Sequence, residues 1–523
     1  MKRTASILIS FACVLVIVFW LILKPILGNT STPPNIVFFL VDDLGWRDVG
    51  CYGSSFYDTP HIDQLAAEGV RFNQAYAACP VCSPTRASIL TGKYPARLQL
   101  TDWLPGRRDF PFQTLTNAAI NQHLPFEEET LAETLKAQGY STAIFGKWHL
   151  GENPSGPLSH GFDVQVPSWN KGWPKLGYHA PFEMDGLEDT KGDYLTDRLT
   201  DEALNFIEQN SDHPFFLYLS HFAVHAPIQG RSDLVKEYRH KLAHMPHHKG
   251  PDFILEGNPD AAEPLSRDQL TTLMTQPSHQ GHRVLPQRTI KIKQHQDNIE
   301  FAAMVEAMDE SLGRVMEKLK SLGLSDNTIV IFYSDNGGLS AANFYYPDRI
   351  VDDTKLVEAY STSNLPLRGA KGWLYEGGIR VPMIVKWPGM GKNGIACEEP
   401  ITSTDFFPSI LEMAGLPAQP DQHMDGVSFV PALKGNDFVR NAIYWHFPHY
   451  SNHGMQSPGG AIRLGDYKLL EYFENNTVQL FNLKEDPGEQ NNLAQAEPEK
   501  ASELLKMLHE WRKDVSAAMM APK

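Results

Sequence analysis

Residues 298–338 have the sequence NIEFAAMVEAMDESLGRVMEKLKSLGLSDNTIVIFYSDNGG, which sets the type of fold. From Asn298 to Leu322 the apolar residues recur three and four positions apart, a pattern that predicts a helix with one buried face. The run from Thr328 to Ser334 is apolar and rich in β-branched and aromatic residues, as is typical of a strand buried on both faces. Polar Asp335 and Asn336 then end that strand. A long helix leading directly into a buried strand is the repeating unit of an α/β fold.

The same unit recurs in the part of the chain before residue 298. Helices are predicted over 129–138 and 193–209, and the strands that follow them over 141–145 and 214–219, after a first buried strand over 35–41. Helices alternating with buried strands predict an α/β fold built on a large, mostly parallel sheet with helices on both faces. In such sheets functional groups gather at the carboxyl ends of the strands.

Polar residues follow four of these predicted strands. They are Asp42-Asp43, Lys147-Trp148-His149, the segment from His221 to His225, and Asp335-Asn336. Because the carboxyl ends of parallel strands meet at one edge of a sheet, we expect these groups to form a single site.

The chain divides into a leader and two structural parts. Residues 33–435 are predicted to form the catalytic domain, with a polar insertion at 229–297, and residues 436–523 a small antiparallel subdomain with a C-terminal helix. Within the insertion, the segment 237–248 is rich in histidine, but its spacing fits no firm metal-ligand pattern, and a solvated loop is favoured. Its histidines are His240, His244, His247 and His248.

The first 32 residues resemble a targeting segment. Lys2 and Arg3 precede an apolar run from Ile7 to Leu23, which is typical of a cleaved signal peptide or of a membrane anchor covering residues 5–27. Both readings remain open, and both predict an exported protein, periplasmic, extracellular or anchored with its catalytic domain outside the cytoplasm. The net charge of −16 over 523 residues makes nucleic acid an unsuitable partner.

The chain has too few cysteines for a disulfide framework. The five are Cys13, Cys51, Cys79, Cys82 and Cys397. A Cys51–Cys79 bridge is left open by the sequence. The pair Cys79-x-x-Cys82 has the spacing of a redox or metal pair, but a single pair without a second is weak evidence for either.

Residues 82–92, CSPTRASILTG, form the most informative motif. They resemble the C-x-P-x-R signature, followed by T-G, of the type I sulfatases, which belong to the alkaline phosphatase superfamily. The resemblance extends over nearly all of residues 33–495 and implies an alkaline phosphatase-like fold and hydrolysis of sulfate esters. It also implies that a maturase oxidises Cys82 to formylglycine, whose hydrate attacks sulfur.

The resemblance extends to the polar groups at the strand ends. Asp42, Asp43, Asp335 and Asn336 are similar to the family's calcium ligands, with the group derived from Cys82 completing the set. Hard oxygen donors of this kind suit one Ca²⁺ ion. Arg86, one helical turn after Cys82, would hold both the aldehyde hydrate and the bound anion.

Three further family blocks carry the remaining catalytic candidates. In Gly146-Lys147-Trp148-His149, the resemblance implies that Lys147 binds sulfate and that His149 takes the proton whose loss eliminates sulfate. His225 is similar to the histidine at the ester oxygen, although His221 lies close to it in the sequence. Lys371, which begins the block ending at Arg380, is similar to the lysine that steadies the leaving group.

The substrate is expected to be a sulfated sugar, met outside the cytoplasm and bearing an exposed sulfate at a chain end. Candidate sugar contacts are Trp103, Arg107, His446 and His449, although the tryptophans of the chain could equally be core residues. Two alternatives remain: a phosphonate or phosphodiester hydrolase of the same superfamily, and an inactive glycan-binding surface protein.

Overall fold

The computed structural model describes residues 33–523 with short gaps. The gaps are 111–112, 262–263, 287, 344–349, 353–360, 389, 391–392, 452 and 454–455. The predicted leader, residues 1–32, therefore lies outside the described residues. No helix in the described part of the chain is both long enough and apolar enough to cross a bilayer.

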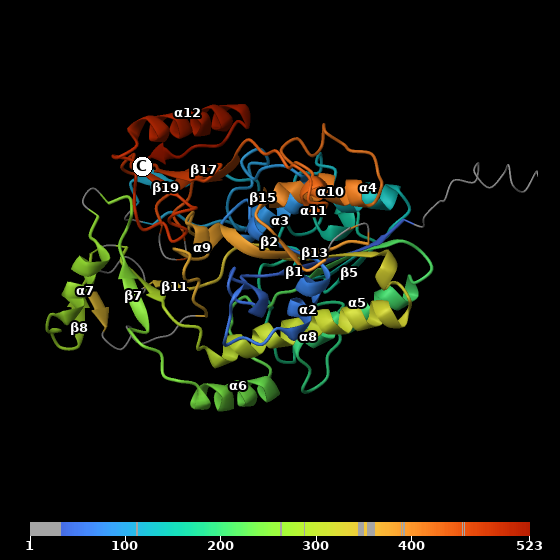
Figure 1. The fold of residues 1–523 in the computed structure, drawn as a ribbon. Coiled ribbons are helices and arrows are strands. Elements are labelled where there is room, and N and C mark those ends of the chain that lie inside the picture. The colour runs from blue at the N-terminus through green and yellow to red at the C-terminus, as the bar shows by residue number, and fades with distance from the viewer. Residues whose placement is uncertain are drawn as a thin grey trace, which may run out of the picture.

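A nine-stranded sheet forms the centre of the described chain (Figure 1). Eight strands follow the order β14-β2-β13-β10-β1-β6-β4-β5, and β15 also pairs with β2. The strands are β1 (Asn35–Val41), β2 (Val70–Tyr76), β4 (Ser141–Gly146), β5 (Val164–Val166), β6 (Phe215–Ser220), β10 (Thr328–Ser334), β13 (Arg380–Lys386), β14 (Ile395–Cys397) and β15 (Ile401–Thr402).

The sheet is parallel except for one strand. β1 pairs in parallel with β10 and β6, and β4 with β6 and β5, whereas β13 runs antiparallel to both β10 and β2. In the β1–β10 pair, Val41 lies opposite Ser334. The residues that follow these two strands therefore emerge side by side at one edge. The predicted mixed, mostly parallel sheet is confirmed.

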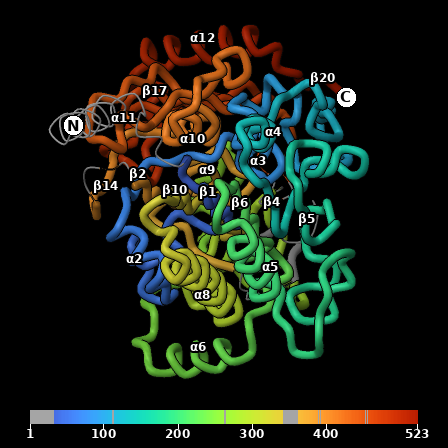
Figure 2. Tube along the Cα trace, turned by 90° about the vertical axis from the view of Figure 1, so that its right-hand side faces the viewer, coloured from blue at the N-terminus to red at the C-terminus, as the bar shows by residue number. Residues whose placement is uncertain are grey.

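Helices cover both faces of this sheet (Figures 1 and 2). One face carries α2 (Pro60–Glu68), α5 (Leu195–Gln209), α6 (Ser232–His244) and α8 (Ile299–Ser321); the other carries α3 (Cys82–Thr91), α4 (Leu131–Ala137), α10 (Phe406–Met413) and α11 (Val430–Leu433).

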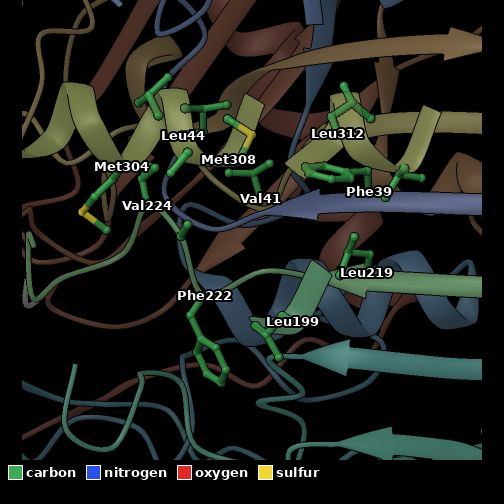
Figure 3. Packing of buried hydrophobic residues seen from close by; sticks show 14 of the residues in the cluster. Phe39, Val41, Leu44, Leu199, Leu219, Phe222, Val224, Met304, Met308 and Leu312 are labelled. Atoms are coloured by element: carbon green, nitrogen blue, oxygen red, sulfur yellow. The ribbon is translucent and has the colours of Figure 1, made fainter. Parts of the chain in front are cut away.

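The alternation of side chains along β1 explains why both faces are covered. Phe39 and Val41 belong to the core beneath α8, whereas Phe38 and Leu40 belong to the core beneath α3 and α10. Figure 3 shows Phe39 and Val41 facing residues of α8 such as Leu312. A strand that is apolar at every position needs two packed layers, because successive side chains point to opposite faces.

The C-terminal part is a separate antiparallel sheet with one helix, as predicted. Its order is β16-β17-β18-β19. The elements are β16 (Ile443–Phe447), β17 (Gly459–Leu464), β18 (Tyr467–Tyr472), β19 (Val478–Asn482) and α12 (Pro498–Asp514). The final strand, β20 (Ala521–Pro522), pairs with β3 (Leu115–Thr116), which ties the described C-terminus to the catalytic part.

Within the insertion 229–297, most of the histidine-rich segment 237–248, predicted to be a solvated loop, is helical, although His240, His244, His247 and His248 are exposed. α6 buries Leu234, Val235 and Tyr238. The remaining elements here and nearby are α7 (Arg267–Thr275), β7 (Phe253–Glu256), β8 (His282–Val284), β9 (Ile290–Lys293), β11 (Ala341–Asn343) and β12 (Ile350–Asp352). The strands among them form two small sheets, β11-β9-β7 and β12-β8.

The four cysteines of the described chain are all free, so no Cys51–Cys79 bridge forms here. Cys13 lies outside the described residues.

Candidate active site

The strand ends bring the predicted polar groups together. Asp42 and Asp43 follow β1, Asp335 and Asn336 follow β10, and Lys147 follows β4. Backbone hydrogen bonds hold these ends in register: Asp335 N–H donates to the Val41 carbonyl at 3.1 Å, and Lys147 N–H to the Ser220 carbonyl at 2.7 Å. The carboxyl edge of the sheet is thus the floor of the candidate site.

Cys82 is the first residue of α3, where the positive end of the helix favours a nucleophile or an anion. Its Sγ lies 3.6 Å from Asp42 Oδ1, and Lys371 Nζ lies 3.5 Å from the same sulfur. Burial raises the pKa of the Cys82 thiol to about 12. The unmodified thiol is therefore protonated at neutral pH and a poor nucleophile.

Arg86, one turn further along α3, links the helix to three strand ends. Its Nε donates to Asp335 Oδ2 at 2.8 Å, and its Nη1 donates to the Lys147 carbonyl at 3.0 Å and to Ser220 Oγ at 2.6 Å. Its Nη2 is buried and makes no hydrogen bond to the described residues. A buried guanidinium with a spare donor is suited to binding an anion.

The carboxylates around Cys82 are close enough to share a cation. One ligand atom each from Asp42, Asp43, Cys82 and Asp335 lie within 4.8 Å of one another, and all four residues are buried. Asn336 Oδ1 is also buried without a hydrogen-bond partner among the described residues. Burial and the neighbouring Asp335 raise the pKa of Asp42 to about 8. Three packed carboxylates and a spare amide oxygen fit a hard divalent cation, which would relieve their repulsion.

Two buried lysines lie against this acidic cluster. Lys147 Nζ is 2.5 Å from Asp42 Oδ2, and Lys371 Nζ is 2.6 Å from Asp43 Oδ1. Burial disfavours the charged forms of both Asp43 and Lys371, but the attraction between the two charges outweighs this effect. It holds the pKa of Asp43 far below its usual range and that of Lys371 above its own. Lys371 is therefore protonated beside Cys82.

The hydrogen bonds of His149 determine which of its nitrogens carries the proton. Its Nε2 is 2.8 Å from the Leu104 carbonyl, which can only accept, so Nε2 is the donor. Its Nδ1 is buried with no partner among the described residues, and burial together with Lys147 holds the pKa of His149 well below its usual value. The neutral imidazole thus offers a free lone pair at Nδ1.

The structure separates the two histidines near the end of β6. His225 Nε2 lies 3.8 Å from Asp43 Oδ2, and its Nδ1 donates to the Ala226 carbonyl at 2.6 Å. His221 is instead fully buried, with Nε2 2.9 Å from Ser311 Oγ and its ring against Phe39. Of these two histidines, His225 is the one that faces the acidic cluster.

The four residues predicted to contact sugar lie largely inside the protein. His446 is 4 % exposed with Nε2 bound to the Ala518 carbonyl, and His449 is 1 % exposed with Nε2 2.8 Å from Thr101 Oγ1. Trp103 packs against the core beneath the C-terminal sheet, and Arg107 donates to the Ser451 carbonyl at 2.9 Å. These placements fit structural roles, so the proposed sugar contacts of His446 and His449 are not supported.

Two residues beside the site, His453 and Gly172, were not predicted from the sequence. His453, from the C-terminal part, interacts electrostatically with Lys371 and Asp43, and its carbonyl accepts from Trp373 Nε1 at 3.1 Å. Gly172 lies directly against the His149 ring: a Cβ built on it would be 2.3 Å from His149 Cε1. Neither residue belongs to a recognisable motif, so no local signal marks them.

Comparisons with known proteins agree with this geometry. The sulfatase family model matches residues 34–416, and a model of the C-terminal part of N-sulphoglucosamine sulphohydrolase matches residues 370–517. A sulfatase from Formosa agariphila is 30% identical, covering 92% of this chain and 89% of its own. N-acetylgalactosamine-6-sulfatase from Canis lupus familiaris is 31% identical, covering 88% of this chain and 76% of its own.

A solved structure supports the same relationship. The crystal structure of Ps i-CgsB in complex with k-i-k-neocarrahexaose has a TM-score of 0.67 and 27% identity to this chain, covering 92% of this chain and 93% of its own. That protein binds a hexasaccharide.

Proposed function

Because the chain belongs to the sulfatase family of the alkaline phosphatase superfamily, a family of sulfuric ester hydrolases, we propose that it removes sulfate from carbohydrates through a formylglycine formed at residue 82. The observation that carries the proposal is the position of Cys82. It begins a helix, its Sγ lies 3.6 Å from Asp42 Oδ1 and 3.5 Å from Lys371 Nζ, and Arg86 lies one turn further along. A nucleophile formed there would lie between the buried carboxylates and the cations Arg86, Lys147 and Lys371, which suits an anionic ester.

The proposed site requires a Ca²⁺ ion and a formylglycine at residue 82. Asp42, Asp43, Asp335 and Asn336 would hold one Ca²⁺, together with an oxygen of the group formed at Cys82. The ion would supply positive charge next to the sulfuryl oxygens, and the hydrated aldehyde would supply a hydroxyl nucleophile with a second hydroxyl on the same carbon. Oxidation of Cys82 requires a maturase as partner.

The chain's own cations bind and orient the sulfate. Arg86 has a buried Nη2 that makes no hydrogen bond within the described structure and lies 4.0 Å from Asp42 Oδ1, and Lys371 carries its proton beside residue 82. Lys147 is fully buried, with its Nζ 2.5 Å from Asp42 Oδ2. Fixed donors of this kind stabilise charge that develops on the sulfuryl oxygens without having to reorganise.

Proton transfer divides between the two histidines. His149, neutral and with Nδ1 unpartnered in the described structure, would accept the proton from the second hydroxyl at residue 82. His225 points Nε2 towards Asp43, and an anionic ester beside it would favour its protonated form, from which Nε2–H donates to the leaving oxygen. Lys371 would assist at the same oxygen.

The relatives and the predicted leader support a sugar as substrate. N-acetylgalactosamine-6-sulfatase and a protein bound to a carrageenan-type hexasaccharide are among the relatives, and the predicted leader directs the chain out of the cytoplasm. We place the catalytic domain at 33–435 and the second subdomain at 436–523. Trp103 and Arg107, both partly exposed, remain candidates for direct contact with the sugar.

Release of free sulfate from a panel of defined esters tests the proposal. The panel contains sulfated mono- and oligosaccharides, an aryl sulfate and a phosphonate monoester, each given to the wild type and to Cys82→Ala. We expect sulfated sugars to be hydrolysed by the wild type alone. Faster turnover of the phosphonate than of any sulfate ester, or undiminished activity in Cys82→Ala, would contradict it.

A further inference from the structure

A long connection runs along the catalytic edge between β5 and α5. It covers residues 167–194 and contains no helix or strand. Because β5 is parallel to β4, its carboxyl end lies at the same edge as Lys147 and His149. Connections of this length without regular structure are uncommon in compact domains and usually functional.

The connection is in direct contact with the active site. Gly172 is buried, and a Cβ at this position would lie 2.3 to 2.7 Å from three atoms of the His149 imidazole. Any side chain here would displace either the ring or the backbone, so glycine is required for the close approach. The segment therefore forms a wall against the histidine that we assign to sulfate release.

The residue after Gly172 presents a large apolar ring to solvent. Trp173 is 39% exposed, whereas its neighbour Pro174 is buried. The backbone that carries Trp173 is held in place, because Trp169 Nε1 donates to the Trp173 carbonyl at 2.6 Å and the Trp169 ring packs against the main core. Trp173 thus exposes part of a large apolar side chain on an anchored backbone, directly after the residue that packs on His149.

We propose that Trp173 is a binding platform for the sugar unit joined to the sulfated one. This inference rests on the proposed function and adds a second subsite to it. Because the segment covers His149, a sugar unit beyond the sulfated one would meet it when the sulfate lies against Arg86 and His149. A tryptophan offers a flat, rigid face with little entropy to lose, and the C–H face of a pyranose ring is complementary to it.

The charges of the same segment indicate what kind of sugar binds there. Lys171 is paired with Glu152, and Lys175 Nζ donates to the Glu183 carbonyl at 2.8 Å with the Glu183 carboxylate 3.8 Å away. Both ammonium groups are thus compensated, which leaves little attraction for a second sulfate. The platform favours a neutral sugar face over another anionic group.

Kinetics with matched substrates test this platform. The same sulfated sugar is supplied as a monosaccharide and at the end of a tetrasaccharide, to the wild type, to Trp173→Ala and to Trp173→Tyr. We expect Trp173→Ala to raise KM for the tetrasaccharide about 3- to 10-fold, the value of one lost ring contact, with kcat little changed. KM for the monosaccharide should change less than about twofold, and Trp173→Tyr should restore most of the loss.

A matched control removes another exposed apolar side chain of the segment. Leu176, which is 51% exposed, is changed in Leu176→Ala, and KM for the tetrasaccharide should stay at the wild-type value. Equal KM values for wild type and Trp173→Ala with the tetrasaccharide would overturn the inference while leaving the proposed function intact. The inference is also overturned if Trp173→Ala and Leu176→Ala raise KM for the tetrasaccharide equally. It is overturned as well if Trp173→Ala raises KM for the monosaccharide and for the tetrasaccharide by the same factor.

Binding measured without turnover gives a second readout. Calorimetric titration of Cys82→Ser protein with the tetrasaccharide should show weaker binding when Trp173→Ala is added. If the titration instead shows Trp173 strengthening the binding of a hydrophobic alkyl sulfate but not of the tetrasaccharide, the platform serves an apolar aglycone and the inference fails. Absence of hydrolysis of every sulfated sugar, by contrast, would count against the proposed function.

Discussion

Lys468 connects the C-terminal sheet to the loop that carries Lys371, and replacing it should be costly. Its Nζ lies 3.0 Å from Glu376 Oε1 and 2.9 Å from Glu489 Oε1, and the side chains of all three are fully buried. Glu376 begins α9 (Glu376–Ile379), directly after the Lys371 loop, and its backbone N–H donates to Glu489 Oε2 at 2.7 Å. Tyr76 O–H donates to Glu376 Oε2 at 2.7 Å from the main sheet.

The magnitude follows from the charges left behind. In Lys468→Met two buried carboxylates lose their common cation, and breaking a buried ion pair from one side costs about 3–5 kcal/mol. Glu489→Gln is the matched control. Burial, with help from Glu376 and against Lys468, raises the pKa of Glu489 to about 7, so the wild-type group already holds a proton much of the time near neutrality. Glu489→Gln should therefore lower the free energy of unfolding by about 1 kcal/mol or less.

Urea unfolding of both variants at pH 6 and pH 8 measures these costs. Without Lys468 the pKa of Glu376 should rise above the unfolded value, and that of Glu489, already above it, should rise further. The folded variant then binds more protons than the unfolded chain and loses stability as the pH rises. The cost of Lys468→Met should therefore be larger at pH 8 than at pH 6. A cost below about 1 kcal/mol, or one equal to that of Glu489→Gln, would refute the reasoning.

Three further outcomes follow from the site and the core. His225→Ala should lower turnover of sugar sulfates about 10²- to 10⁴-fold and of activated aryl sulfates far less, in steady-state assays; equal losses on both would count against leaving-group protonation. Asp335→Ala should lose bound calcium, measured by elemental analysis, as well as turnover; retention of both would show the metal assignment to be wrong. Burial holds the pKa values of His221, His446 and His449 at about 3. Because the unfolded value is about 6.5, the stability contributed by each neutral histidine is lost as the pH falls below that value, by about 1.4 kcal/mol per unit. Urea midpoints at pH 7 and pH 5 measure this loss, which His221→Gln should reduce; a flat profile would contradict it.

The position of the site could be predicted because it depends on strand ends. Asp42 and Asp335 are far apart in the sequence, but each directly follows an apolar run that can only be a buried strand. Once those strands pair in parallel, with Val41 opposite Ser334, the two carboxylates meet without any further information. The hydrophobic pattern of each strand and the parallel pairing of the strands were together sufficient to predict where the carboxylates meet.

Side-chain burial in the C-terminal part could not be predicted in the same way. His446 lies on β16 in a segment rich in aromatic residues, which has the composition of either a sugar-binding loop or a core strand. Its partner, the Ala518 carbonyl, comes from the far end of the chain. A contact made by two distant segments leaves no periodicity in either one, so exposure could not be inferred.

The antiparallel strand β13 and the packing of Gly172 on His149 could not be predicted from the sequence either. β13 is an antiparallel strand that follows the short helix α9 instead of a long amphipathic one, so the helix-then-strand pattern does not mark it. The packing of Gly172 on His149 depends on the path of an irregular connection, which hydrophobic periodicity does not describe.

Mass spectrometry of the tryptic peptide Phe72–Arg86 from catalytically active enzyme examines the step on which the proposed function depends. We expect residue 82 to carry an aldehyde in place of the thiol, and the rate of sulfate release to rise in proportion to the aldehyde fraction across preparations. Full activity in a preparation whose peptide contains only unmodified Cys82 would contradict it.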